Sequence, residues 1–175
     1  AEIDAQFDSL PHMIAGADLV LGASLVFALS SVAEVMGIKY RFIAFAPQLL
    51  PSCHHPFMAF KYQRFPGWIN GMGWHLAAFL DKLNITKLIN THRRKTGLAP
   101  LKSAWEHILG QDVIIASDEE IAAAPPDAAV SYAQTGYMHL SQPSRHLPKL
   151  ESFLSAGPAP VFSGFGSMPK KDQAK

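Results

Sequence analysis

The sequence has little cysteine, few charged residues and no long hydrophobic run. Cys53 is the single cysteine in 175 residues, which excludes an internal disulfide and any zinc site built on cysteine pairs. We therefore expect a reducing compartment and take the cytoplasm as the location. The uncharged apolar run at 19–33 is shorter than the roughly 20 residues that cross a bilayer, and Gly22 and serines interrupt it. The first eight residues carry acids and no cationic segment, so no signal peptide is expected there.

Acidic and basic residues nearly balance, which removes another class of function. Fifteen Lys and Arg against 14 Asp and Glu leave a net charge of +1, which gives no broad basic surface for a polyanion. Nucleic acid is therefore not an expected partner. Hydrophobic residues make up 49% of the chain, enough to build one packed domain.

The order of apolar segments predicts an α/β fold with a parallel sheet. A helical stripe starts at Ile3, should break or kink near Pro11, and is closed by Gly16. The expected strands are 17–21, 40–46, 113–116 and 129–134. A helix at 25–36, ended by Gly37, joins the first two strands. Short joints between helix and strand are typical of a right-handed βαβ crossover.

The middle of the chain predicts a long loop followed by long helices. The proline-rich segment 47–66 should form an ordered, irregular loop with one helical turn, and loops of this length usually have a function. Apolar residues recur every three to four positions over 68–95, which predicts one long helix or two abutting ones, with Phe79 in the core. Trp68 and Trp74 either pack in that core or offer flat stacking surfaces. A short helix is expected at 101–109.

The pattern changes after Gly136. Residues 137–148 lack periodicity, as a linker does, and 150–154 predict a helical turn. An apolar strand at 160–164 then enters a glycine-rich turn, which is how a Rossmann-like unit begins.

Three stretches carry a likeness to known proteins. They are SVAEVMGIKYRFIAFAPQLLPS at 31–52, NTHRRKTGLAPL at 90–101, and QTGYMHL through LESFLSAGPAPVFSGFGSMP at 134–169. In this order the chain resembles the GT-B-fold glycosyltransferases that act on glycopeptide and macrolide antibiotics and on sterols. The last stretch is the most specific, because its elements rarely coincide.

The resemblance implies two Rossmann-like domains that face each other across a cleft. It divides the chain into the later part of the acceptor-binding domain at 1–136, an interdomain linker with a short helix at 137–158, and the first strand and glycine-rich turn of the donor-binding domain at 159–175. The implied reaction moves a sugar from a UDP- or TDP-sugar to a hydroxyl of a lipophilic small molecule, such as an antibiotic aglycone, sterol or lipid. The nucleotide sugar is a co-substrate, and no other cofactor is expected.

The resemblance also assigns binding roles, although no residue here inherits the family's catalytic base. The predicted acceptor-binding residues are Gln48, Leu49, His54, His55, Trp68 and Trp74. The predicted donor-phosphate-binding residues are Gly164, Gly166 and Ser167, because glycine lets backbone N–H groups approach a pyrophosphate. Plant-type relatives keep an aspartate after the strand matching 17–21, where this chain has Gly22, Ala23 and Ser24. Ligands of open α/β sheets lie beyond the carboxyl ends of strands, here 22–24, 46–48, 117–118 and 164–167.

Two local clusters admit more than one interpretation. Cys53, His54 and His55 are not expected to bind metal, because adjacent residues rarely face one ion and no cysteine pair completes the site. The basic run of Lys87 and 92–95 either meets anionic lipid or phosphate, or forms a solvated helix end that complements the helix dipole. A non-enzymatic binding or membrane-associating α/β module, with peripheral membrane contact, is therefore the alternative function.

Both the activity and the association state of the chain follow from the domain assignment. Because neither domain is whole, the 175 residues alone are expected to be inactive. The strand at 17–21 lacks a central neighbour and becomes an apolar edge. Self-association of the chain, strand exchange or a retained partner fragment is therefore expected.

Overall fold

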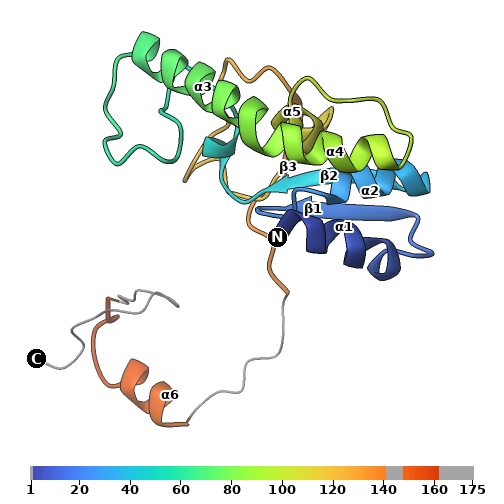
Figure 1. Ribbon diagram of the computed structural model, residues 1–175. Coiled ribbons are helices and arrows are strands. Elements are labelled where there is room, and N and C mark those ends of the chain that lie inside the picture. Colours follow the sequence, from blue (N-terminus) through green and yellow to red (C-terminus); the bar gives the residue numbers. More distant parts are fainter. Residues whose placement is uncertain (1, 141–147, 162–175) are drawn as a thin grey trace, which may run out of the picture. The chain divides into compact units, whose positions relative to one another are not determined.

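A parallel four-stranded sheet forms the centre of the larger part of the chain (Figure 1). The computed structural model describes residues 2–140 and 148–161, and the chain divides into two compact units, 1–138 and 139–175. The strands are β1 (Leu19–Ala23), β2 (Lys39–Ala44), β3 (Asp112–Ile115) and β4 (Ser131–Gln134). They lie in chain order, and each neighbouring pair is parallel. The predicted α/β class with a Rossmann-like parallel sheet is confirmed.

The first crossover follows the predicted order with shifted boundaries. β1 begins two residues later than expected, and α2 (Leu29–Met36) begins four residues later. The later start of α2 has a physical cause in Gln6. The Gln6 side chain donates to Leu25 O at 2.9 Å and accepts from Ala28 N at 3.1 Å. These bonds hold the segment before α2 as a turn. Gly37 ends α2 with φ of 68°, as predicted, because glycine adopts this left-handed conformation without a Cβ clash.

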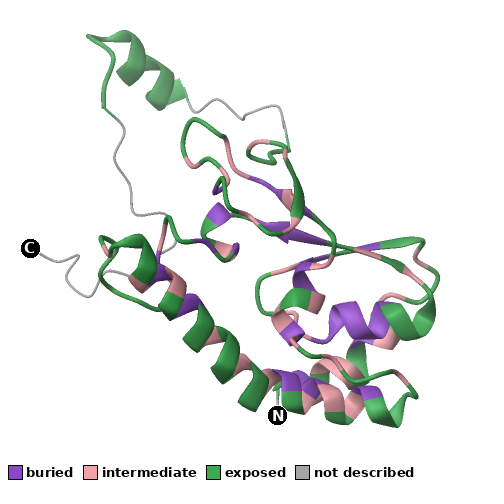
Figure 2. Ribbon diagram, turned by 90° about the horizontal axis from the view of Figure 1, so that it is seen from above, coloured by how far each residue is buried: buried purple, intermediate pink, exposed green. Residues whose placement is uncertain are grey.

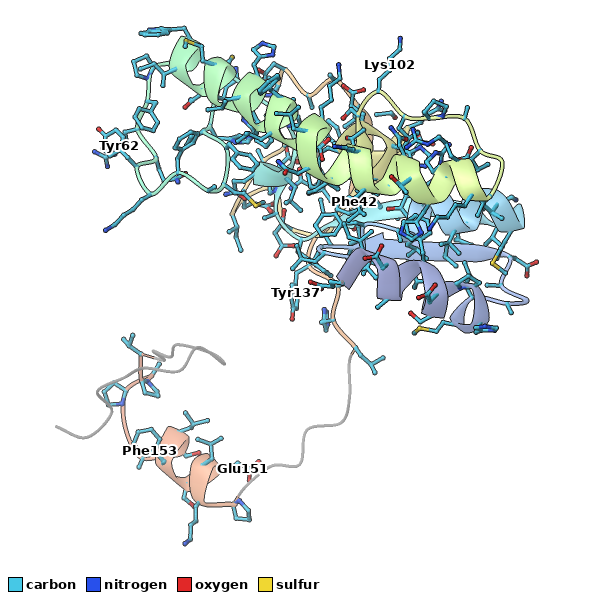
Figure 3. The ribbon with its side chains drawn as sticks, viewed as in Figure 1. Phe42, Tyr62, Lys102, Tyr137, Glu151 and Phe153 are labelled. Carbon is cyan, nitrogen blue, oxygen red and sulfur yellow. The ribbon has the colours of Figure 1, made fainter. Side chains whose placement is uncertain are left out.

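Helices cover one face of the sheet. α1 (Glu2–Met13) contacts α2 and α4 (Lys87–Lys95), and α2 contacts both β1 and β2 as well as α5 (Ala104–Leu109). Pro11 lies inside α1, which continues to Met13, so the proline does not break the helix there although it removes one backbone donor. The core under this layer contains Phe42, which is 1% exposed and is labelled in Figure 3. Its other fully buried members include Ile89, Ile108, Val113 and Ile115.

The opposite sheet face carries exposed side chains. Strand alternation places Leu19 and Leu21 of β1 there, 49% and 51% exposed. Arg41 of β2 pairs with Asp112 of β3 on the same face, with Arg41 Nη2 3.2 Å from Asp112 Oδ2. β1 pairs with β2 alone among the described residues. It is therefore an edge strand, as predicted.

One continuous helical segment follows the loop. α3 (Gly67–Asp81) passes through a π-helical turn, η2 (Lys82–Thr86), directly into α4, which confirms the predicted long or abutting helices. The predicted burial of Phe79 is wrong, since Phe79 is 57% exposed. The buried side of α3 holds Asn70, Gly73 and Trp74 instead. Gly73 is needed there, because a Cβ would lie 2.9 Å from the Phe60 ring.

Short elements complete the described chain. The expected single turn in the loop is a 3₁₀ helix, η1 (Pro47–Leu49). α5 begins after Ser103, whose Oγ accepts from Glu106 N at 3.2 Å and so caps the helix. In the second unit, α6 (Pro148–Ser155) contains the predicted turn, and no residue of it is buried. Residues 159–161 form no strand, and the rest of the expected strand at 160–164 lies outside the described residues. In the part of the chain that the structure describes, no helix is long and apolar enough to span a membrane.

Candidate functional site

A cavity of about 390 Å³ opens where β1 and β2 end. Ser24 follows β1, and Ala46 and Gln48 follow β2. The lining residues are Ser24, Phe45, Ala46, Gln48, Leu49, Pro56, Met58 and Gln63. Two of the four strand ends expected to share one rim therefore meet at a hollow. Ser117 and Asp118 do not line it, and Gly164 to Ser167 lie outside the described residues.

Ser24 has an unusual backbone at this cavity. Its φ is 51°, and it is the one non-glycine residue with positive φ in the described ranges 2–140 and 148–161. Such a conformation costs energy for a residue with a Cβ, and residues of this kind cluster at binding and active sites. Ser24 is also the first residue after β1, where the plant-type relatives of the resembled family are expected to carry an aspartate. The observation identifies Ser24 as a candidate site residue that side-chain patterns alone did not single out.

Asp127 fixes the start of the loop at 47–66 by hydrogen bonds, and residues of this loop line the cavity. Its Oδ1 accepts from Ser52 Oγ at 2.6 Å, and its Oδ2 accepts from Cys53 N at 2.7 Å. Ser52 Oγ in turn accepts from His54 N at 2.9 Å. Hydrogen bonds to the carboxylate, first that of Ser52, lower the pKa of Asp127. The charged form is therefore the one that holds the loop.

α3 holds the middle of the same loop. Asn70 Nδ2 donates to Cys53 O at 2.9 Å, and Trp74 Nε1 donates to His55 O at 3.2 Å. The Trp74 indole also meets the rings of His55 and Phe57 edge to face, at centroid distances of 5.8 and 5.2 Å. These contacts use the buried side of α3. They satisfy the Asn70 amide nitrogen, whereas Asn70 Oδ1 is buried and has no hydrogen-bond partner among the described residues.

The structure separates the six predicted acceptor-binding residues into three groups. Gln48 and Leu49 line the cavity. His55 and Trp74 are packed against each other beneath the loop, with Trp74 only 8% exposed. His54 is exposed, and Trp68 is 68% exposed on α3. Neither of these last two lines the cavity, so contact between them and an acceptor stays a prediction.

Three potential metal ligands lie together at the loop, although two of them are neighbours in sequence. Ligand atoms of Cys53, His54 and Asp127 lie within 4.8 Å of one another, and all three residues are exposed. The carboxylate already accepts hydrogen bonds from Ser52 and from Cys53, and the hydrogen bond with Asp127 raises the pKa of the Cys53 thiol. Asp127, and not His55, is the residue that joins Cys53 and His54 here. The expectation that no metal binds at this loop stays a prediction.

A second set of polar contacts fixes the exit of β4. Gln134 Nε2 donates to Ser117 O and to Ala122 O, both at 2.9 Å. Gly136 has φ of 78°, and a Cβ on it would lie 2.8 Å from Asp118 Oδ1. Asp118 Oδ1 also accepts from Tyr137 N at 3.0 Å. The Thr135–Gly136 pair that helped to carry the resemblance thus has a structural role at the last strand end.

Two residues of the basic run, His92 and Arg93, pack against other helices, whereas Lys87 is exposed. Arg93 is 2% exposed and forms an ion pair with Glu34. His92 Nε2 lies 2.7 Å from Asp4 Oδ1, and its ring stacks on Phe7 at 4.3 Å. The interpretation as a solvated helix end is wrong for Arg93, and so is the interpretation of Arg93 as a lipid or phosphate contact. Arg94 and Lys95 remain exposed.

The sequence missed site residues of two kinds: residues that line the cavity directly, namely Phe45, Pro56, Met58 and Gln63, and residues that hold the loop. Asp127 and Asn70 touch backbone atoms of a loop that is distant in sequence. Asp127 follows the Pro125–Pro126 pair, which indicated a loop and said nothing of its contacts. The available signal was Asn70, one of the few polar side chains in the mostly apolar α3.

Comparison with known proteins extends the observations on the fold and cavity. The chain matches no protein-family model. It is 32% identical over 169 residues to glycosyltransferase GtfC of Amycolatopsis orientalis, a match that covers 94% of this chain and 41% of that protein. The chain is homologous to part of the glycopeptide-antibiotic glycosyltransferases. The resemblance stated from the sequence is thereby confirmed.

Two further relatives from the same organism agree. Identity is 29% over 170 residues to the vancomycin aglycone glucosyltransferase, covering 95% of this chain and 42% of that protein. It is 29% over 164 residues to a dTDP-epi-vancosaminyltransferase, covering 92% of this chain and 37% of that protein. The chain thus spans about two fifths of the length of the relatives it matches.

Proposed function

We propose that this chain is part of a glycosyltransferase that moves a sugar from a UDP- or TDP-sugar to a hydroxyl of a lipophilic small molecule. Two observations together support this proposal. The chain is homologous to glycopeptide-antibiotic glycosyltransferases over 94% of its length. It also has a cavity at the carboxyl edge of its parallel sheet, the edge where ligands of such sheets bind.

The chemistry of the cavity suits such an acceptor. Phe45, Leu49 and Met58 supply apolar wall, while Ser24, Gln48 and Gln63 supply hydrogen-bonding groups. Binding sites for small molecules combine these features, with apolar area for affinity and a few polar groups for orientation. One relative acts on the vancomycin aglycone by name. We propose a glycopeptide-like aglycone as the acceptor class.

The donor side of the reaction rests on the relatives. One of them is named for a dTDP-sugar. We propose that a nucleoside diphosphate sugar is the co-substrate of this protein as well. In the reaction the acceptor oxygen loses its proton as it attacks the anomeric carbon, and the nucleoside diphosphate leaves with the bonding electron pair. Contact of Gly164, Gly166 and Ser167 with the donor phosphates remains part of the proposal. The catalytic base is assigned to no residue of this chain.

The proposal that this chain binds the acceptor and not the donor can be tested on the purified chain. We expect titration calorimetry to detect binding of vancomycin aglycone, and to detect neither tight binding of dTDP-glucose nor sugar transfer when both are supplied. Gln48→Ala should weaken aglycone binding, and Gln111→Ala, at an exposed position just before β3 and outside the cavity lining, serves as the control. Tight binding of the nucleotide sugar, or transfer, would contradict the assignment of this chain to the acceptor side.

Location and membrane contact complete the proposal. A single exposed cysteine, Cys53, suits the cytoplasm, which we keep as the proposed location. The alternative of a non-enzymatic, membrane-associating module has one specific observation in its favour, the exposed apolar side of α3. That surface is compatible with the enzyme proposal.

A further inference from the structure

The outward side of α3 and η2 is almost wholly apolar. Its members are exposed by about half or more, from Leu80 at 48% to Trp68 at 68%. We call this surface the α3 face, and it consists of Trp68, Met72, Leu76, Phe79, Leu80 and Leu83. Figure 2 shows most of α3 coloured as exposed. This arrangement inverts the usual amphipathic helix, which turns its apolar stripe inward.

The spacing makes these residues one continuous surface. Trp68, Met72 and Leu76 follow one another at four-residue steps, so each lies above the next on the helix. At 100° per residue the α3 face covers roughly a third of the helix circumference, and its length from first to last residue is roughly 22 Å. Scattered exposed apolar residues are ordinary, whereas a contiguous patch marks an interaction site.

Cations flank the α3 face. Lys61 and Arg64 lie in the loop before α3. Lys82 follows Phe79 by three residues and is therefore its neighbour on the helix surface. All three cations are exposed. The single acid of α3 and η2, Asp81, accepts a hydrogen bond from Thr86 Oγ1 at 2.8 Å. Tyr62, 58% exposed, projects from the loop in Figure 3. The segment 61–83 therefore combines an apolar helix side, aromatic rings and three exposed cations.

We propose that the α3 face binds the surface of an anionic phospholipid bilayer, with α3 lying in the plane of the interface. Trp, Phe and Leu on the exposed side of a helix, with Lys82 close by in η2 and Lys61 and Arg64 in the preceding loop, are the residue types that place a helix in this position. A second copy of the chain fits less well, because it would bring the like-charged cations of the two copies together. The proposal is independent of sugar transfer. It also places membrane contact away from Arg93 and His92, which face inward.

Vesicle co-sedimentation of the full chain tests the proposal. We expect binding to vesicles of phosphatidylcholine with phosphatidylglycerol, and weaker binding to phosphatidylcholine alone. The double variant Leu76→Ser/Phe79→Ser should keep its circular dichroism, since both residues are exposed, and should lose about tenfold or more in partitioning. The variant Lys61→Glu/Lys82→Glu should lose about fivefold per cation and its preference for anionic lipid.

Matched controls separate this surface from general effects. Val35→Ser/Ile121→Ser removes two exposed apolar side chains elsewhere, and Lys39→Glu/Lys102→Glu reverses two exposed charges elsewhere; both should bind vesicles like the unaltered chain. Absence of binding to anionic vesicles would overturn the proposal, as would equal loss in the controls. A lipid-free dimer in sedimentation velocity that Leu76→Ser/Phe79→Ser abolishes would assign the α3 face to a second copy instead.

Discussion

Arg93 and Glu34 form a two-bond ion pair that joins α4 to α2. Arg93 Nη1 lies 2.6 Å from Glu34 Oε2, and Nη2 lies 3.2 Å from Oε1. The same guanidinium donates to Ser31 Oγ at 3.1 Å and, through Nε, to Ala99 O at 2.8 Å. Arg93 itself is 2% exposed, and its loss leaves the buried Ser31 Oγ without this donor, whereas Glu34 and Ala99 are exposed and can bind water instead. The pair therefore stabilises the helical layer that supports the sheet.

The first prediction compares two neighbouring arginines. Arg93→Ala should lower the free energy of unfolding by about 1 to 3 kcal/mol, because the packing and hydrogen bonds of the buried Arg93 side chain are lost while the exposed Glu34 carboxylate regains water. Arg94→Ala, at an exposed position, should change it by about 0.5 kcal/mol or less. Urea unfolding followed by circular dichroism measures both. Equal losses of unfolding free energy in the two variants would contradict the claim that the Arg93–Glu34 ion pair stabilises the fold.

The second prediction concerns pH. Burial and the nearby Arg93 charge lower the pKa of His107 from its ordinary 6.5, and hydrogen bonds from Arg93 lower the pKa of Glu34 from its ordinary 4.5. Both groups bind fewer protons when folded than when unfolded, so stability falls as pH decreases. The contribution of His107 is present above pH 6.5 and is lost below it, and that of Glu34 is lost below pH 4.5.

Urea midpoints measured from pH 8 to pH 4 check this dependence. We expect the midpoint to fall steadily with acidification, and His107→Asn to flatten the part of the curve just below pH 6.5. His139→Asn, in the second unit, should leave that part unchanged. A midpoint that rises with acidification would contradict the assigned directions.

The sequence predicted the fold better than the site, for a physical reason. Strands and helices follow from short-range periodicity, so the parallel sheet, the Gly37 helix end and the long helix after the loop were all predicted. Periodicity does not say which side of a helix is covered, and Phe79 was therefore placed in the core although it is 57% exposed. The loop clamp by Asp127 depends on residues about 75 positions apart, which no local pattern encodes. Arg93 was misjudged similarly, since its partner lies on another helix.

The third prediction uses Cys53 to report on the loop clamp. Asp127 raises the pKa of the exposed Cys53 thiol, chiefly through a hydrogen bond. Asp127→Asn should therefore lower that pKa, increase the thiolate fraction near pH 8 and speed alkylation by iodoacetamide a few-fold. Asp118→Asn, in the same inter-strand connection, is the control. Unchanged or slower alkylation in Asp127→Asn would mean that the carboxylate does not govern the thiol.

The fourth prediction concerns the edge of the sheet. β1 pairs with β2 alone among the described residues, and Leu19 and Leu21 are about half exposed. Exposed apolar edge strands pair with other chains, so we expect concentration-dependent association of the purified chain. Leu19→Lys/Leu21→Lys should reduce it, whereas Met13→Lys/Ile121→Lys, at exposed positions elsewhere, should not. A sharply monomeric sedimentation profile of the unaltered chain would contradict this account.

The proposed acceptor role of the cavity is tested most directly by mapping a ligand onto single residues. In an amide nitrogen–proton NMR titration of the isotope-labelled chain with vancomycin aglycone, the account predicts the largest shifts at Ser24, Gln48 and Leu49. It predicts small shifts at Leu19 and Leu21 on the uncovered sheet face. An unchanged spectrum, or shifts gathered away from the carboxyl ends of β1 and β2, would contradict the proposal that this chain forms the acceptor side of a glycosyltransferase.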